Sequence, residues 1–146
     1  MIPKNEKVKV SMVEPWDANS VEEAERMVSR YKGDMLAVMR WLAGCLIYAG
    51  WKHDNSKQSD IDGYFNALVE AKREGIDVHD TEWYKDHFKK ERSHLDYLVP
   101  EDVDLLDVME FVVSNVLEGA DSISLSADVL AKALANTFAF VKAHVE

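Results

Sequence analysis

The sequence predicts an all-α protein, a single-domain bundle of about six helices. From Ser20 onward, apolar residues recur at helical spacing, and residues that favour helix N-termini precede these segments. The one alternating stretch, residues 7–13, has no convincing partner strand later in the chain. We therefore expect an N-terminal arm over residues 1–19, which forms an extended segment, an oligomer contact or a hairpin, and a helical domain over residues 20–146.

Two helices are expected before residue 50. Residues 20–23, Ser-Val-Glu-Glu, match a capping box, which predicts a helix over residues 21–31. Gly33 is expected to end this helix, and Asp34 can cap a second one over residues 34–49. The apolar positions of the second helix are Leu36, Met39, Leu42, Cys45, Leu46 and Ala49.

Three further helices are expected over residues 60–72, over residues 101–117 and after residue 126. The residues expected to begin or end them are Ser59 or Asp60, Gly75, Pro100, Glu101, Asp102, Gly119, and Ser124 or Ser126. Between them, Thr81 can cap a helix over residues 82–95. On that helix His87, Glu91 and His94 stand at positions i, i+4 and i+7, so we expect them to share one face.

Composition limits the possible functions. A chain of 146 residues with 47% hydrophobic and 30% charged residues is typical of one globular domain. Its net charge of −10 argues against nucleic-acid binding, which needs a surplus of Lys and Arg, but it permits a small phosphorylated substrate. Cys45 is the single cysteine, so no disulfide can form within the chain and a reducing compartment is expected.

No targeting or membrane segment is predicted. The N-terminal residues contain no continuous apolar stretch of signal-peptide length. The longest apolar run, residues 35–49, is interrupted by Arg40 and is too short to span a bilayer. We therefore expect a cytoplasmic protein without a membrane partner.

The most informative residues for chemistry are His53 and Asp54, which follow this apolar run. An imidazole and a carboxylate side by side can share one metal ion, although polar residues also simply end helices. Further candidate ligands lie downstream, and a bundle can hold a metal between facing helices. They are His87, His94 and Asp107, with Glu110 one turn after Asp107.

The order of these residues resembles the HD-domain superfamily of metal-dependent phosphohydrolases. More closely, three segments resemble a family of mostly uncharacterised phage and bacterial proteins that carries an HD-x-S-K signature. The segments are His53-Asp54-Asn55-Ser56-Lys57, Trp83-Tyr84-Lys85-Asp86-His87, and Glu91-Arg92-Ser93-His94-Leu95-Asp96-Tyr97. The resemblance covers residues 34 to 120 and implies an HD-domain-like helical fold.

The resemblance also implies roles for single residues. His53 and Asp54 would be metal ligands, with His87 and His94 as further ligands or phosphate-contacting groups. Asp107 would stand for the final aspartate of the superfamily, and Glu110 is the alternative. The superfamily also has a histidine ligand upstream of the pair, but no histidine precedes His53 here, and Asp34 lies near that position.

The expected chemistry is hydrolysis of a nucleotide or another small phosphate ester by metal-activated water. The mixed donor set fits Mn, Fe, Co, Ni or Zn, and Mg is not distinguished from them. Lys57 and Arg92 could hold the non-bridging oxygens of a phosphate. Glu91 could act as an outer ligand or a proton acceptor, or it could be an ordinary exposed carboxylate.

Two other functions fit parts of the sequence. All-α nucleotide pyrophosphatases bind Mg²⁺ through acidic pairs, for which Glu22 and Glu25 offer one and Glu74 and Asp77 a nominal second. The third possibility is a non-catalytic phage or bacterial interaction protein that binds through exposed tryptophans. Its candidates are Trp16, Trp41 and Trp83. A homo-oligomer is compatible with each of these functions.

Overall fold

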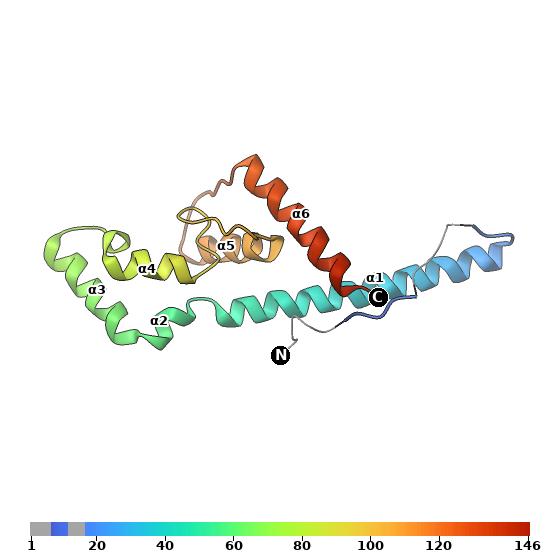
Figure 1. Ribbon diagram of the computed structural model, residues 1–146, viewed down its shortest axis with the longest axis horizontal. Helices are drawn as coiled ribbons and strands as arrows, with labels where there is room; N and C mark the ends of the chain where they lie inside the picture. The colour runs from blue at the N-terminus through green and yellow to red at the C-terminus, as the bar shows by residue number, and fades with distance from the viewer. Residues whose placement is uncertain (1–6, 12–16) are drawn as a thin grey trace. The chain divides into compact units, whose positions relative to one another are not determined.

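A computed structural model describes residues 7–11 and 17–146 and confirms the all-α fold class (Figure 1). The helices are α1 (Val21–Lys52), α2 (Asn55–Ser59), α3 (Ile61–Glu74), the 3₁₀ turn η1 (Val78–Asp80), α4 (Glu82–Lys90), α5 (Leu105–Leu117) and α6 (Ala127–His144). The chain forms two compact units, which divide within α1 and within α6. Unit 1 contains the residues up to Tyr48 together with Thr137–Glu146, and unit 2 contains Ala49–Asn136.

Helix α1 is one continuous helix of 32 residues, so the predicted break at Gly33 is wrong. Gly33 has no positive φ and lies within the helix, where a glycine costs about 1 kcal/mol but does not end it. Asp34 caps nothing there, because its carboxylate accepts hydrogen bonds from the backbone N–H and the hydroxyl of Ser11. Across residues 7–11 and 17–146, no helix has the length and apolarity needed to cross a bilayer.

An aromatic stack and a backbone bridge contribute to the packing of unit 1. The buried Trp41 ring lies 5.1 Å from the ring of Phe140 and 5.1 Å from that of His144. Val8 pairs with Val145 in an isolated parallel bridge, in which Val8 N–H donates to the carbonyl of His144 at 2.8 Å. The described part of the predicted arm therefore binds the C-terminal end of its own chain; residues 12 and 13 of the alternating stretch lie outside the described residues.

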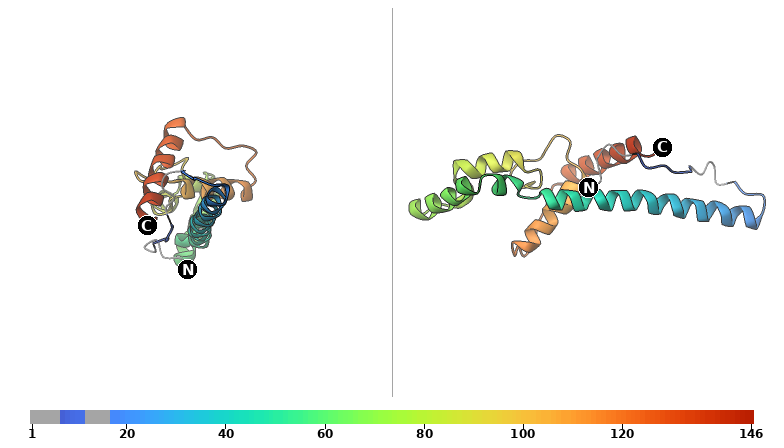
Figure 2. Two further views of the ribbon diagram at one scale, coloured as in Figure 1. Left: turned by 90° about the vertical axis from the view of Figure 1, so that its right-hand side faces the viewer. Right: turned by 90° about the horizontal axis from the view of Figure 1, so that it is seen from below.

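The first half of unit 2 is a pair of packed helices, α3 and α4, which lie side by side in Figure 2. Asp60 caps α3 as predicted, by accepting the N–H of Gly63 at 3.1 Å, and it also accepts Trp83 Nε1–H at 2.7 Å. A Cβ atom at Gly63 would lie 2.6 Å from Trp83 Nε1, so this close approach requires glycine. Thr81 caps α4, also as predicted.

The second half of unit 2 has its own hydrophobic core. Leu95, Val103, Phe111 and Ala133 are buried in one cluster. Helix α5 begins at Leu105 instead of residue 101, because Asp104 and Asp107 form a capping box. Helix α4 ends at Lys90, where residues 82–95 were predicted to be helical, so Glu91 and His94 do not continue its face.

Candidate metal centre

Three of the predicted ligands, Asp54, His87 and His94, converge in unit 2. One atom from each lies within 4.8 Å of the other two. Asp54 Oδ1 is 3.4 Å from His87 Nε2 and 3.9 Å from His94 Nε2, and the two Nε2 atoms are 2.9 Å apart. Asp54 precedes α2, His87 is buried on α4, and His94 lies in the loop after α4. The residues of this triad thus come from three separate segments.

The spacing of the triad suits a single ion. Ligand atoms about 2.1 Å from one ion lie roughly 3.0 Å apart in octahedral and 3.4 Å apart in tetrahedral geometry. Two of the three separations, 2.9 and 3.4 Å, match these values, and the third, at 3.9 Å, requires a small movement of the His94 ring. Three protein ligands leave a coordination position for water or substrate, as in catalytic metal sites.

The carboxylate of Asp54 is not used to cap the helix that follows it, so it is available to the triad. Asp54 is the N-cap residue of α2 and adopts a left-handed conformation, with φ 55° and ψ 24°. Its side chain makes no capping hydrogen bond. Instead, the N–H of Ser56 in the first turn donates to Glu91 Oε1 at 2.9 Å. Glu91 therefore caps the N-terminus of α2 in place of Asp54. The Asp54 carboxylate lies toward His87 instead.

The two oxygens of Asp54 have different surroundings. Oδ2 accepts a hydrogen bond from Lys57 Nζ at 2.8 Å, and Nζ lies 5.6 Å from the centroids of the Tyr64 and Tyr84 rings. Oδ1 is buried and has no hydrogen-bond partner among the described residues. Burial acts to raise the pKa of Asp54, but contacts with His87 and Lys57 outweigh it and hold the pKa well below its ordinary value. The carboxylate is thus charged, with one unsatisfied buried oxygen, which normally requires a partner.

Both histidines of the triad can offer a lone pair. Ser56 Oγ lies 2.7 Å from His87 Nδ1, so a proton on Nδ1 leaves Nε2 free to act as a ligand. Burial, with the neighbouring His87, lowers the pKa of His94 to about 4, so His94 is neutral at pH 7. A metal requires neutral imidazole and ionised carboxylate. Asp54 and His94 meet this requirement near neutrality.

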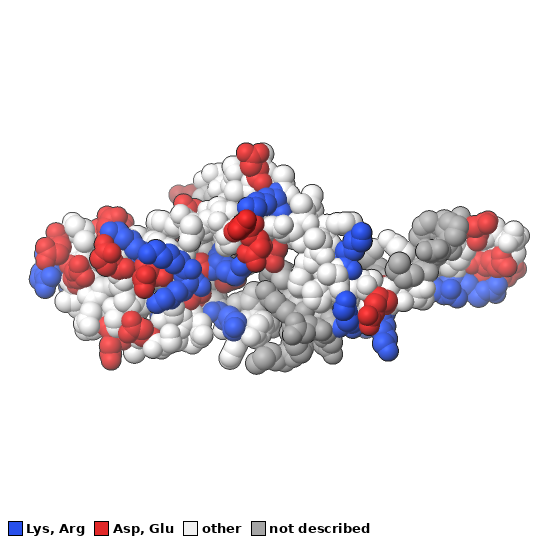
Figure 3. Space-filling model, viewed as in Figure 1, with Lys and Arg blue, Asp and Glu red and all other residues white. Residues whose placement is uncertain are grey.

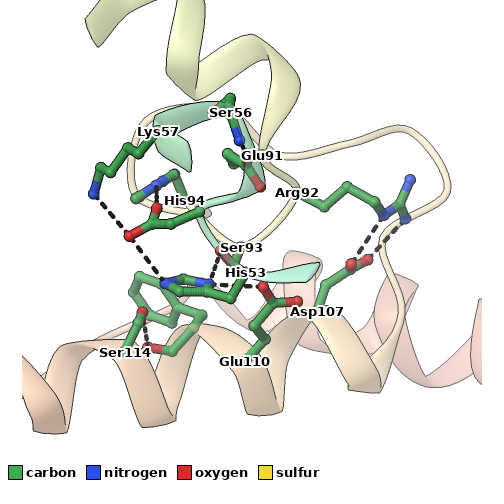
Figure 4. Close-up of polar contacts among 12 residues, drawn as sticks. His53, Ser56, Lys57, Glu91, Arg92, Ser93, His94, Asp107, Glu110 and Ser114 are labelled. Carbon is green, nitrogen blue, oxygen red and sulfur yellow. Dashed lines mark hydrogen bonds and ion pairs between the residues drawn. The ribbon is translucent and has the colours of Figure 1, made fainter. Parts of the chain in front are cut away.

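His53 lies beside the triad and is bound to Glu110. Its Nδ1 is 2.8 Å from Glu110 Oε1 and 3.3 Å from Ser93 Oγ, and its Nε2 is 3.7 Å from Asp54 Oδ2 (Figure 4). The hydrogen bond with Glu110 raises the pKa of His53. Glu110, the alternative to Asp107 in the sequence, is therefore the carboxylate that reaches the His53–Asp54 pair.

The structure does not bring Asp107 to the triad. Arg92 donates to Asp107 Oδ1 through Nε at 2.9 Å and to Oδ2 through Nη2 at 2.8 Å, as the fork in Figure 4 shows. Asp107 Oδ2 also accepts the N–H of Asp104 in the capping box. Both oxygens are therefore occupied. Arg92 in turn reaches Asp102 through Nη1, so it is held in a structural ion pair and not presented to a phosphate.

Sequence reasoning missed the polar residues that orient the triad. Ser56 appeared as part of the signature, but its contact with His87 depends on how α2 and α4 pack. Lys57, a predicted phosphate-binding residue, donates to Asp54 Oδ2, and Glu91, predicted to share a helix face with the histidines, accepts the N–H of Ser56. The identity of Ser56 and Lys57, close after Asp54, is the sequence signal that could have suggested these contacts.

A pocket of about 360 Å³ adjoins the triad on the side of His87. Its lining residues are Ser56, Ser59, Asp60, Glu82, Trp83, Asp86, His87 and Lys90. The acidic residues in it have cationic or donor partners: Glu82 pairs with Lys85, and Asp86 with Lys89 and Lys90. Figure 3 shows this mixture of charges over α3 and α4. The pocket is therefore polar, and its walls carry three carboxylates and one lysine, a negative surplus that Lys85 and Lys89 partly offset.

The residues of the other two functions are not assembled in the same way. Arg73 pairs with Glu74, and Asp77 accepts hydrogen bonds from His79, so these carboxylates have local partners. Trp41 is buried and Trp83 is half-buried; Trp16 lies outside the described residues. Within residues 7–11 and 17–146, the group of three or more metal-ligating side chains is the triad.

We compared the chain with known protein families, curated proteins and solved structures. No protein-family model, no curated protein and no solved structure matches this chain.

Proposed function

We propose that the protein is a metal-dependent hydrolase that cleaves a nucleotide or another small phosphate ester. The observation that carries the proposal is the buried Oδ1 of Asp54, which accepts no hydrogen bond from the described residues and faces the Nε2 atoms of His87 and His94. A buried anionic oxygen without a hydrogen bond is costly, and a cation between these three atoms would satisfy it. Asp54, His87 and His94 would hold the ion.

The bound divalent ion would lower the pKa of water and polarise a phosphoryl oxygen. The surrounding residues would prepare the site. Lys57 fixes Oδ2 of Asp54, so that Oδ1 remains for the ion, and Ser56 fixes the His87 ring. His53 lies with Nε2 3.7 Å from Asp54 Oδ2 and is oriented by Glu110, so it can accept or donate a proton at the edge of the site.

The choice of a phosphate ester rests on the resemblance of the His53–Lys57, 83–87 and 91–97 segments to the HD-domain superfamily. The two cations expected to bind phosphate are engaged with carboxylates, Lys57 with Asp54 and Arg92 with Asp107. The ion would therefore supply most of the positive charge that a phosphate meets. Substrate binding should accordingly depend on metal more steeply than on any single lysine or arginine.

The test is a measurement of metal content and phosphate release on the same purified protein. We expect about one divalent ion per chain by elemental analysis. We also expect phosphate release from p-nitrophenyl phosphate or from a panel of nucleoside mono- and triphosphates with added Mn²⁺. Asp54→Asn should lose both metal and turnover, whereas the control Asp107→Asn should keep both. If the protein binds metal but releases phosphate from none of these esters, the proposed hydrolase activity is wrong and the proposed metal site still holds.

The donor set itself favours one second candidate. Two histidines and one carboxylate with open coordination positions are also the ligands of non-haem Fe(II) oxygenases. Oxygen consumption by the protein loaded anaerobically with Fe(II), and abolished by Asp54→Asn, would identify this class. The same preparation assayed with Mn²⁺ and phosphate esters separates the two.

A further inference from the structure

Helix α1 carries an exposed apolar stripe, which consists of Val21, Val28, Met35 and Met39. These side chains are 72%, 46%, 46% and 55% exposed, respectively. The first three are seven residues apart, and Met39 follows one turn later, so all four lie along one side of the helix. Apolar side chains at this exposure gain stability when another surface covers them.

The first three residues of the stripe belong to a heptad repeat that continues along α1. Apolar residues alternate at steps of three and four, the spacing typical of coiled coils. They are Val21, Ala24, Val28, Tyr31, Met35, Val38, Leu42 and Cys45. The C-terminal end of the repeat is covered within the chain, since Cys45 is buried, whereas the N-terminal end is exposed. The same pattern is thus satisfied at one end of the helix and open at the other.

We propose that this stripe binds the same stripe of a second copy of the chain, in an antiparallel helix pair. A heptad helix is complementary to a helix of the same spacing. The proposal concerns assembly and does not depend on the metal site.

The charges beside the stripe support the antiparallel orientation. The start of α1 is acidic, with Glu22, Glu23 and Glu25, and the following turns are basic, with Arg26, Arg30 and Lys32. Pairing about a centre between residues 29 and 30 sets Val28 against the partner's Tyr31. It also places Glu25 near the partner's Lys32, and Lys32 near the partner's Glu25. A parallel pair would bring the two acidic first turns to the same end, which is unfavourable.

The size of the stripe sets the expected strength. Two helical segments of this length bury on the order of 1,000 Å² in total, at the small end of specific interfaces. The dimer should therefore be reversible, with a dissociation constant in the micromolar range, roughly −8 kcal/mol.

The test is sedimentation equilibrium of the full chain from about 1 to 300 μM, a range that brackets a micromolar constant. Met35→Glu should raise the dissociation constant more than about tenfold, because it buries a charge in the stripe, while glutamate preserves the helix. The control is Ile47→Glu, since Ile47 is 75% exposed on α1 but lies off the stripe, and it should leave the constant unchanged.

Charge exchange tests the orientation. Glu25→Lys and Lys32→Glu should each weaken the dimer about five- to tenfold, and the double exchange should restore it. A wild-type chain that is monomeric throughout the range would overturn the proposal, and so would an equal effect of Ile47→Glu and Met35→Glu. Failure of the double exchange to restore binding would overturn the antiparallel pairing.

Discussion

Asp54 and Asp107 are both carboxylates of unit 2 at the N-terminal end of a helix, and the sequence suggests both as metal ligands. In the structure they differ in what their oxygens contact. Asp107 is the more buried, with 7% of its side chain exposed against 28% for Asp54, yet both of its oxygens accept hydrogen bonds from Arg92. Asp54 is paired through Oδ2 with Lys57, and its buried Oδ1 has no hydrogen-bond partner among the described residues.

This difference shows that burial and residue type alone do not identify a metal ligand. A carboxylate whose oxygens are satisfied contributes to stability, because its removal leaves a donor without an acceptor. A carboxylate with unused acceptor capacity next to two imidazoles has the requirements of a metal ligand. The left-handed backbone of Asp54 agrees with this distinction, since such conformations are costly and cluster at functional sites.

The largest expected effect is the loss of metal binding in Asp54→Asn. Asparagine tolerates the left-handed backbone and keeps the side-chain volume, but its neutral amide is a poor ligand. We expect the dissociation constant for Mn²⁺ or Zn²⁺ to rise more than about 100-fold, by calorimetry on protein stripped with EDTA. Far-ultraviolet circular dichroism should show unchanged helix content. An unchanged metal affinity would show that Asp54 is not a metal ligand and that it does not differ from Asp107 in this respect.

Asp107→Asn should act on stability instead. It removes the charge from the fork with Arg92 and weakens the capping box at α5, so we expect the free energy of unfolding to fall by about 2–3 kcal/mol. Urea denaturation of the metal-free protein measures this. Metal affinity should stay within about twofold of the wild type. A large loss of affinity would show that Asp107 belongs to the site after all.

The metal-free protein should lose stability in mild acid because of His94. Its pKa is about 4 in the folded protein, against 6.5 for an ordinary histidine. Between these values the unfolded chain binds the extra proton, so the free energy of unfolding falls as pH falls, by about 2 kcal/mol from pH 7 to pH 5. His53 has a raised pKa and acts in the opposite sense, so it partly offsets the His94 effect at the upper end of this pH range. His94→Gln should flatten the slope between pH 5 and 7 in urea titrations, and an unchanged slope would contradict the assignment.

Ser56→Ala should weaken metal binding without removing a ligand. The Ser56 hydroxyl holds His87 Nδ1 at 2.7 Å, and its loss frees the ring orientation and the tautomer. Changes of this kind cost about tenfold in metal affinity. Calorimetry should show the loss, and Ser56→Thr, which retains the hydroxyl, should recover most of it. Equal affinity in wild type and Ser56→Ala would show that His87 is oriented by packing alone.

The smallest expected effect is that of Glu91→Ala on the backbone before α2. The Glu91 carboxylate accepts the N–H of Ser56 in the first turn of α2, so its removal should lower the free energy of unfolding by about 1 kcal/mol. Metal affinity should fall only a few-fold, through less precise placement of Asp54. Glu91→Gln keeps an acceptor oxygen and should restore both quantities. A loss of affinity as large as that of Asp54→Asn would make Glu91 a ligand instead of a cap.

Several features of the protein could be predicted from the sequence because they depend on residues a few positions apart. Ser20, Asp60, Thr81 and Ser126 each accept the backbone N–H three residues later, as their positions predicted. The all-α class follows from helical periodicity, which is also local. Asp54, His87 and His94 were also recognisable as candidate ligands from their residue types.

Only the tertiary structure decided which candidates meet. His94 contacts His87 although α4 ends at Lys90. Two of the residues between them make other contacts: Glu91 accepts the N–H of Ser56, and Arg92 donates to Asp107. Gly33 does not end α1, because helix continuity depends on the whole neighbourhood and not on one residue. Sequence shows which charged groups exist. The path of the chain decides which partner each one finds, and therefore which buried oxygen remains without one.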